Sequence, residues 1–328
     1  MLVNPAEIRK VARPALLDFL RQEADDIDVE IREGRFQRAL ALVASLSSIL
    51  GGVEVAYMHY RGSFSRRIMY TPLYCAVGVF AAGLWAVKSR RAARTVLPIV
   101  CIVTLADGVI GFYFHIRGVQ RKPGGWRLPV VNIIMGPPLL APLMFTVSAY
   151  LGLIAAYLRR SGHLEEHRFP RPADPGHFGR LITAGRHDRI DWRQDLREGR
   201  FQKHMAVATI VSAFLSGFEA LYSHYKNGFQ YKVAQSSPLV VAPALMIAAG
   251  AAIKNKRAAH TLLPAVSVAA MVNGGIGTFY HVRGIARRPG GFKKPFYNLL
   301  WGPPVFAPLL FSACGFLGLL ASLLRREK

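Results

Sequence analysis

The chain has 328 residues, of which 52% are hydrophobic, and it carries 42 Lys and Arg against 19 Asp and Glu, a formal net charge of +23. A soluble nucleic-acid-binding protein is often this basic, but it lacks long uncharged apolar segments, so that class is excluded and no nucleic-acid partner is expected. Such segments occur throughout this sequence. Because a spanning segment must satisfy its backbone hydrogen bonds internally, we predict an all-α integral membrane protein in contact with the lipid bilayer.

Most of the sequence consists of two similar copies. The hexapeptide Arg-Glu-Gly-Arg-Phe-Gln at 32–37 recurs at 197–202, and Gly-Pro-Pro at 136–138 recurs at 302–304. A nearly fixed offset over this length indicates a tandem duplication. The predicted organisation has four parts: an N-terminal cytoplasmic or interfacial segment at 1–31, a first membrane repeat at 32–160, a polar linker at 161–193 and a second membrane repeat at 194–328.

Each repeat contains four apolar runs. They fall near 39–60, 70–87, 95–116 and 128–158, and then near 205–225, 234–253, 261–282 and 295–324. Because four is an even number, both repeats enter the bilayer from the same side, which predicts eight transmembrane helices in two parallel four-helix repeats. Within the fourth run of each repeat, Pro142 or Pro308 is expected to kink the helix.

The loops divide between two sides of the membrane. We define side B by the loops at 61–69, 117–127, 226–233 and 283–294, and side A by the opposite ends of the helices together with both termini and the linker. Side-B loops hold 14 of the 42 Lys and Arg, and the other 28 lie on side A. This bias predicts a bacterial inner-membrane protein with cytoplasmic termini.

The acidic residues are distributed more unevenly. Sixteen of the 19 lie on side A, and the remaining three, Glu54, Asp107 and Glu219, lie within predicted helices. Side-B loops therefore contain no carboxylate, which suits either anionic lipid headgroups or an anionic ligand. Four arginines that follow the third span of each repeat are candidates for binding phosphate, carboxylate or haem propionate: Arg117, Arg121, Arg283 and Arg287.

Ionisable residues recur at the side-B ends of the first and third spans. Glu54 and His59 near the end of the first span recur as Glu219 and His224, and His115 at the end of the third span recurs as His281. An ionisable side chain within a membrane is costly unless it is paired or functional. Asp107, which is replaced by Asn273 in the second repeat, is a candidate proton relay or a hydrogen-bond partner for a neighbouring helix.

The paired histidines predict a haem b site in each repeat. In an up-down bundle the first and third helices are diagonal, so His59 would face His115 and His224 would face His281. Two imidazoles facing each other across a bundle can hold haem iron. Glycines four and seven residues before His115, and at the same places before His281, would offer a smooth strip to the macrocycle. The expected function is electron transfer or other membrane redox chemistry with a membrane or periplasmic partner.

Two alternatives remain open at this point. A non-haem metal could be held by Glu54, His59 and His115, and again by Glu219, His224 and His281, in a membrane oxidoreductase. The spacing is unfavourable, because residues five apart lie on different faces of a helix. A transporter of an anion or a proton-coupled solute would suit the parallel repeats and the polar residues inside the spans.

Overall fold

The computed structural model describes residues 35–160 and 200–323, and that part of the chain consists of helices joined by turns and loops, without strands. The expected N-terminal segment and linker lie outside the described residues. The main helices of the first half are α2 (Arg35–Arg61), α3 (Thr71–Lys88), α4 (Arg90–Arg94), α5 (Val96–Gln120), α6 (Pro129–Ile134) and α7 (Ala141–Arg160). Those of the second half are α10 (Arg200–Lys226), α11 (Ala242–Lys254), α12 (Lys256–His260), α13 (Leu262–Ala286), α14 (Pro295–Trp301) and α15 (Leu309–Leu323).

Seven of the described helical segments are long and apolar enough to cross a membrane, and α15, with 15 residues, is a shorter apolar helix. Their outer faces carry large hydrophobic side chains, such as Ile102, Val109 and Ile247, the last of which is 68% exposed. Extended apolar exposure of this kind is unfavourable in water and normal against lipid. The chain is therefore a helical multi-pass membrane protein.

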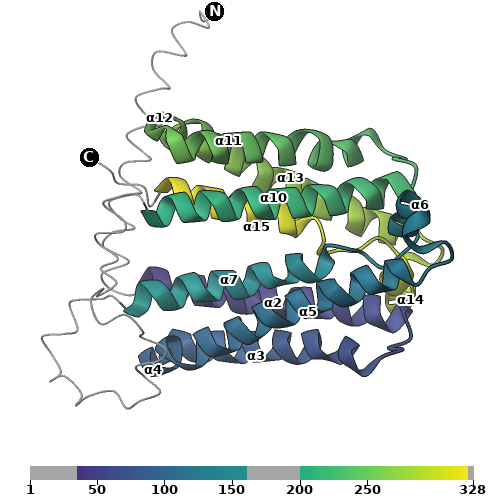
Figure 1. The fold of residues 1–328 in the computed structure, drawn as a ribbon, viewed down its shortest axis with the longest axis horizontal. Coiled ribbons are helices and arrows are strands. Elements are labelled where there is room, and N and C mark those ends of the chain that lie inside the picture. The colour runs from purple at the N-terminus through teal and green to yellow at the C-terminus, as the bar shows by residue number, and fades with distance from the viewer. Residues whose placement is uncertain (1–34, 161–199, 324–328) are drawn as a thin grey trace, which may run out of the picture.

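The helices of each half form a four-membered ring. In the first half α2 contacts α3 and α7, and α5 contacts the same two helices, so α2 and α5 occupy diagonal corners as predicted. In the second half α10 and α13 are diagonal in the same way, with α11 and α15 between them. The short helices α4 and α12 lie at one end of the molecule, and α6 and α14 lie at the other (Figure 1).

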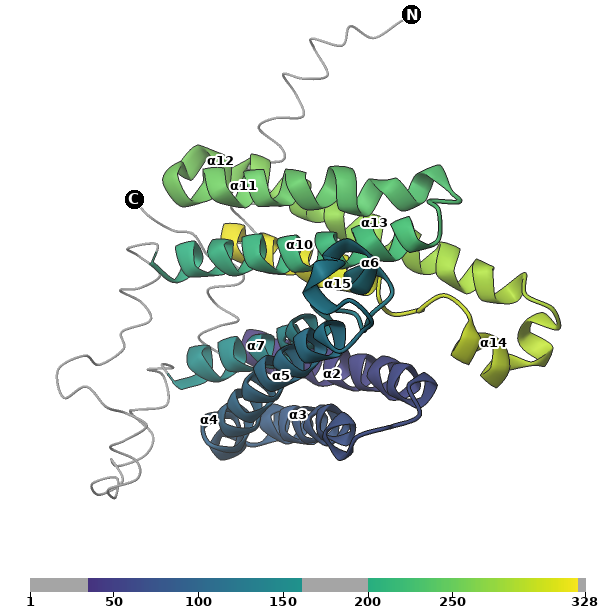
Figure 2. The ribbon, with the colours of Figure 1, turned by 45° about the vertical axis from the view of Figure 1, so that its right-hand side comes forward.

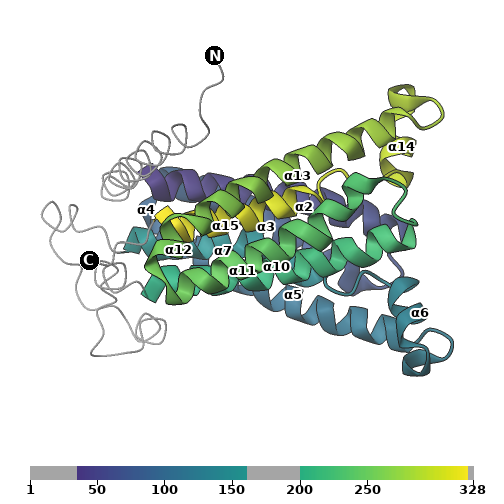
Figure 3. The same ribbon diagram turned by 90° about the horizontal axis from the view of Figure 1, so that it is seen from above.

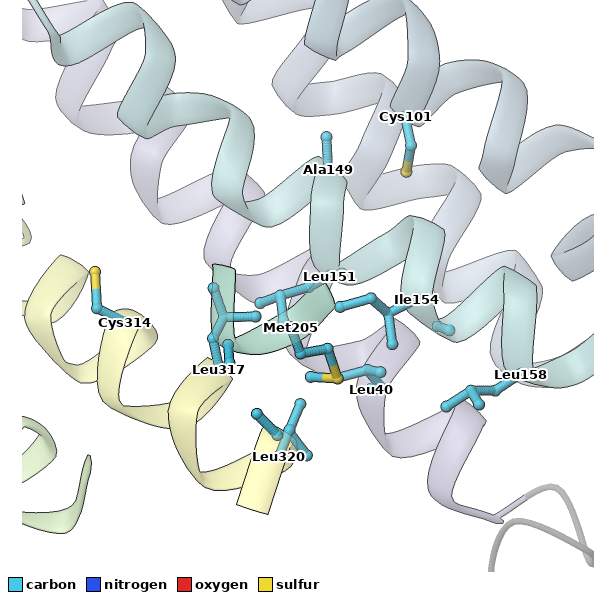
Figure 4. Close-up of a cluster of buried hydrophobic side chains, with 14 of the residues drawn as sticks. Leu40, Cys101, Ala149, Leu151, Ile154, Leu158, Met205, Cys314, Leu317 and Leu320 are labelled. Atoms are coloured by element: carbon cyan, nitrogen blue, oxygen red, sulfur yellow. The ribbon is translucent and has the colours of Figure 1, made fainter. Parts of the chain in front are cut away.

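The two halves pack against each other through α7 and α10. Leu151 and Ile154 of α7 approach Met205 of α10, and Leu317 and Leu320 of α15 close the cluster (Figure 4). In a bilayer such contacts stabilise mainly through close packing, since lipid is as apolar as the side chains. The halves thus share one apolar core.

The fourth apolar run of each half is broken, and the prediction that Pro142 kinks a continuous helix is wrong. Residues 135–140 are non-helical between α6 and α7, so Pro142 is the second residue of α7. In the second half α15 begins directly after Pro308. Consecutive prolines remove backbone donors and clash with the preceding turn, so the Gly-Pro-Pro segment ends one helix before another begins.

The side-A loops at 88–94 and 254–260 also differ from expectation, because each contains a short helix. The Ser89 side chain accepts a hydrogen bond from the backbone N–H of Ala92 at the start of α4. Asn255 accepts one from the N–H of Arg257 at the start of α12. Ser and Asn are favoured at this capping position, so both loops carried a local helix signal.

Candidate functional site

The histidines of the second half meet at the side-B ends of diagonal helices. The ring centroids of His224 on α10 and His281 on α13 are 6.3 Å apart, with an interplanar angle of 75°. In the first half His59 and His115 occupy the matching ends of α2 and α5, and His59 lies within electrostatic range of His115. All four rings are partly buried.

Three of these imidazoles are oriented by a backbone carbonyl. The Nδ1 atom lies 2.5 Å from the Pro138 oxygen in His115, 2.5 Å from the Pro304 oxygen in His281 and 2.6 Å from the Met69 oxygen in His59. Because a carbonyl oxygen only accepts hydrogen bonds, Nδ1 carries the proton in each. Nε2 of the neutral ring is then an electron-pair donor, which is the arrangement that prepares a histidine for a metal.

The membrane glutamates bind the opposite half of the chain. The Glu219 carboxylate on α10 accepts a hydrogen bond of 3.1 Å from the backbone N–H of Leu140, just before α7, and another from the Tyr222 hydroxyl. The Glu54 carboxyl on α2 faces the backbone N–H of Phe306, which precedes α15. We call these two reciprocal contacts the glutamate caps.

The glutamate caps determine the direction of the two carboxyl groups that the non-haem alternative uses as metal ligands. Within residues 35–160 and 200–323, no group of three His, Cys, Asp or Glu side chains is placed to hold a metal ion. The carboxyl groups of Glu54 and Glu219 are directed to the broken helices, while the imidazoles five residues later lie on another face. Among the described residues the expected Glu-His-His set does not form a ready-made metal site. The non-haem alternative stays a prediction.

Asp107 links α5 to the start of α3. The Thr71 hydroxyl, at the first residue of α3, donates a hydrogen bond of 2.5 Å to the Asp107 carboxylate. At the matching place in the second half, the Ser237 hydroxyl donates a hydrogen bond of 2.5 Å to Asn273 Oδ1. Because an amide makes the same contact as the carboxylate, interhelical hydrogen bonding is the favoured role of this position. The proton-relay role of Asp107 stays a prediction.

The glycines before the histidines do not leave an open strip. A Cβ atom added to Gly111 would lie 3.0 Å from Pro142 Cβ, and one added to Gly277 would lie 2.8 Å from Pro308 Cβ. These glycines therefore let the broken segment pack closely against α5 or α13. The expectation that a macrocycle lies on the strip is wrong, because prolines fill it.

The four candidate anion-binding arginines lie beyond the histidines on side B. Arg117 is half-buried and its guanidinium lies 5.8 Å from the ring centre of Tyr113, whereas Arg121, Arg283 and Arg287 are exposed. A contact not foreseen from the sequence joins the halves nearby, where the Arg61 guanidinium lies 5.3 Å from the ring centre of Trp301. Cation–π pairing of this kind stabilises a contact between elements.

Comparison of the chain with protein-family models, with curated proteins and with solved structures finds no match.

Proposed function

We propose that this membrane protein binds haem b, or another metal centre, through paired histidines at side B and transfers electrons to a membrane or periplasmic partner. The observation that carries the proposal is the pairing of His224 with His281. Two imidazoles that share one metal at ~2.0 Å per metal–nitrogen bond have ring centres about 6 Å apart. The separation of 6.3 Å agrees with that arrangement.

The donor set favours haem over a non-haem ion. Two imidazoles fill two coordination positions, and the part of the chain that the structure describes offers no third ligand beside them. A porphyrin supplies the remaining four positions of haem iron, and His59 with His115 would hold a second haem. Arg117 and Arg121, with Arg283 and Arg287 in the second half, would bind the propionates.

The proposed setting follows from the sequence repeat. We infer that the halves are tandem parallel repeats and that α15 is the eighth span, so both termini lie on one side. The excess of Lys and Arg on side A favours the cytoplasm for that side, and a bacterial inner membrane then exposes the histidine ends to the periplasm.

Absorption spectroscopy of the purified protein tests the proposal. We expect a Soret band that shifts on reduction with dithionite and a haem content of two per chain. His281→Ala should remove about half of the haem, because only one of two sites loses an axial ligand. His204→Ala is the matched control, since His204 is exposed on the same α10 helix but lies near its side-A end. A wild-type protein that lacks both a Soret band and bound metal would refute the proposal.

Transport is a second candidate, favoured by the broken helices. In each half the interrupted fourth run resumes as a new helix, α7 or α15. A glutamate of the other half faces the start of that helix. Interrupted helices at a repeat interface are typical of ion and solute sites in transporters. Proteoliposomes that contain a pH-sensitive dye test this directly. Proton uptake that depends on the protein and is lost in Glu219→Gln would support transport, and no uptake would exclude a proton carrier.

A further inference from the structure

Two protruding segments at side B form a separate candidate surface. We define the first arm as residues 117–134 and the second arm as residues 283–301. Each consists of the last part of α5 or α13, a Pro-Gly-Gly turn, and the short helix α6 or α14. The arms extend from the same end of the bundle and diverge from each other (Figures 2 and 3).

A buried asparagine fixes the turn in each arm. Asn298 is 0% exposed, and its Nδ2 donates hydrogen bonds of 3.1 Å to the Pro289 oxygen and 2.8 Å to the Gly291 oxygen. Asn132 makes the same two bonds in the first arm. Gly290 has a φ of 81°, in the left-handed region that glycine adopts without strain. The side chains that flank the turn are therefore presented from a defined backbone.

The arms carry positive charge without compensation. Their nine cationic residues are Arg117, Arg121, Lys122, Arg127, Arg283, Arg287, Arg288, Lys293 and Lys294. Neither arm contains an Asp or a Glu, and the three carboxylates of the described residues are bound within the bundle. Most of these cations are exposed, so the surface is complementary to an anion.

Exposed aromatic and aliphatic side chains lie among these cations. Phe296 is 87% exposed and Phe292 63%, with Tyr297 beside them, and Trp126 and Val130 are exposed in the first arm. Aromatic side chains at the ends of spans favour the boundary between headgroups and acyl chains. Cations beside them then lie at the depth of the lipid phosphates. A lipid surface offers phosphate groups to the cations and acyl chains to the aromatic rings, and it can contact both diverging arms.

We propose that the two arms bind the headgroups of anionic phospholipids and so gather such lipids around side B. The rings of the arms enter the acyl boundary, and the Lys and Arg side chains bind the phosphodiester groups. None of the four histidines takes part. The arms share Arg117, Arg121, Arg283 and Arg287 with the haem proposal, and their other five cations belong to the lipid surface alone.

The test uses the full chain in nanodiscs of phosphatidylcholine mixed with phosphatidylglycerol, with bound lipids counted by native mass spectrometry. Wild type should retain phosphatidylglycerol about fivefold over its share of the mixture, since each cation near the surface favours anionic lipid by this order. The triple variant Arg287→Gln, Lys293→Gln, Lys294→Gln should lose most of this enrichment. High salt should weaken the enrichment in wild type.

The matched control neutralises three cations at the opposite side, in Lys254→Gln, Lys256→Gln, Arg257→Gln, and should keep the enrichment. Replacing Arg287 by Lys retains the charge and should also keep it, which separates charge from a folding defect. The proposal is overturned if wild type shows no preference, if the arm variant keeps the preference, or if the control loses it equally. It is also overturned if arm neutralisation changes only the oligomeric mass, because the arms would then contact another chain.

Discussion

Replacement of Glu219 by alanine tests the glutamate caps. The Glu219 carboxylate accepts the Leu140 N–H at 3.1 Å, and Leu140 is only 8% exposed. Without the carboxylate this N–H has no acceptor at the start of α7, and an unpaired buried donor costs about 1–3 kcal/mol. Membrane proteins fall in the lower part of that range, because the unfolded state in lipid also finds partners. We expect Glu219→Ala to lower the free energy of unfolding by about 1–2 kcal/mol.

Glu219→Gln should lower it by less than about 1 kcal/mol, because an amide oxygen still accepts the hydrogen bond. The assay is unfolding by sodium dodecyl sulfate in mixed micelles, followed by far-ultraviolet circular dichroism. Tyr222→Phe serves as a control that removes the second donor and leaves the Leu140 contact. If the alanine variant is as stable as wild type, or if the glutamine variant is destabilised equally, the backbone contact does not hold the halves together.

Three further changes can be followed by the same unfolding assay. Asn298→Ala removes both hydrogen bonds that fix the turn of the second arm and should cost about 2 kcal/mol, with faster amide exchange in that turn; unchanged exchange would contradict this role. Gly274→Ala places a Cβ 2.7 Å from a proline carbonyl and should cost about 1–3 kcal/mol. Gly275→Ala, which has open space, should be nearly neutral, and equal losses would reject the packing argument. Asp107→Asn should cost less than about 1 kcal/mol, because Asn273 fills the same role; a larger loss would require the charge.

The diagonal placement of the first and third helices could be predicted because it follows from local signals. Apolar runs locate the helices, and an even number of runs with short loops requires neighbouring helices to be antiparallel. The third run, expected at 95–116, corresponds to α5 at Val96–Gln120, and this helix continues beyond His115 into the first arm. His115 therefore lies more than one turn inside the helix, and the sequence did not show where the apolar run would leave the bundle.

The glutamate caps could not be predicted, since Glu219 and Leu140 are 79 residues apart and belong to different halves. The sequence repeat predicts that Glu54 and Glu219 share a role, but a repeat carries no information on which half supplies the partner. The break before α7 was missed for a related reason. Gly-Pro-Pro predicts a disturbed helix, and only the packed neighbours decide whether it bends or stops. Asn132 and Asn298 carried a usable signal in their recurrence beside the Pro-Gly-Gly turn.

The two glutamate caps have a consequence for the stability of each half on its own. In isolation, either four-helix unit would bury a carboxyl group and an amide that each need a counterpart from outside. Two separately expressed units, cut within the connection between them, should therefore seek each other in the membrane. Joining both halves in one polypeptide keeps each carboxyl group beside its partner in the other half.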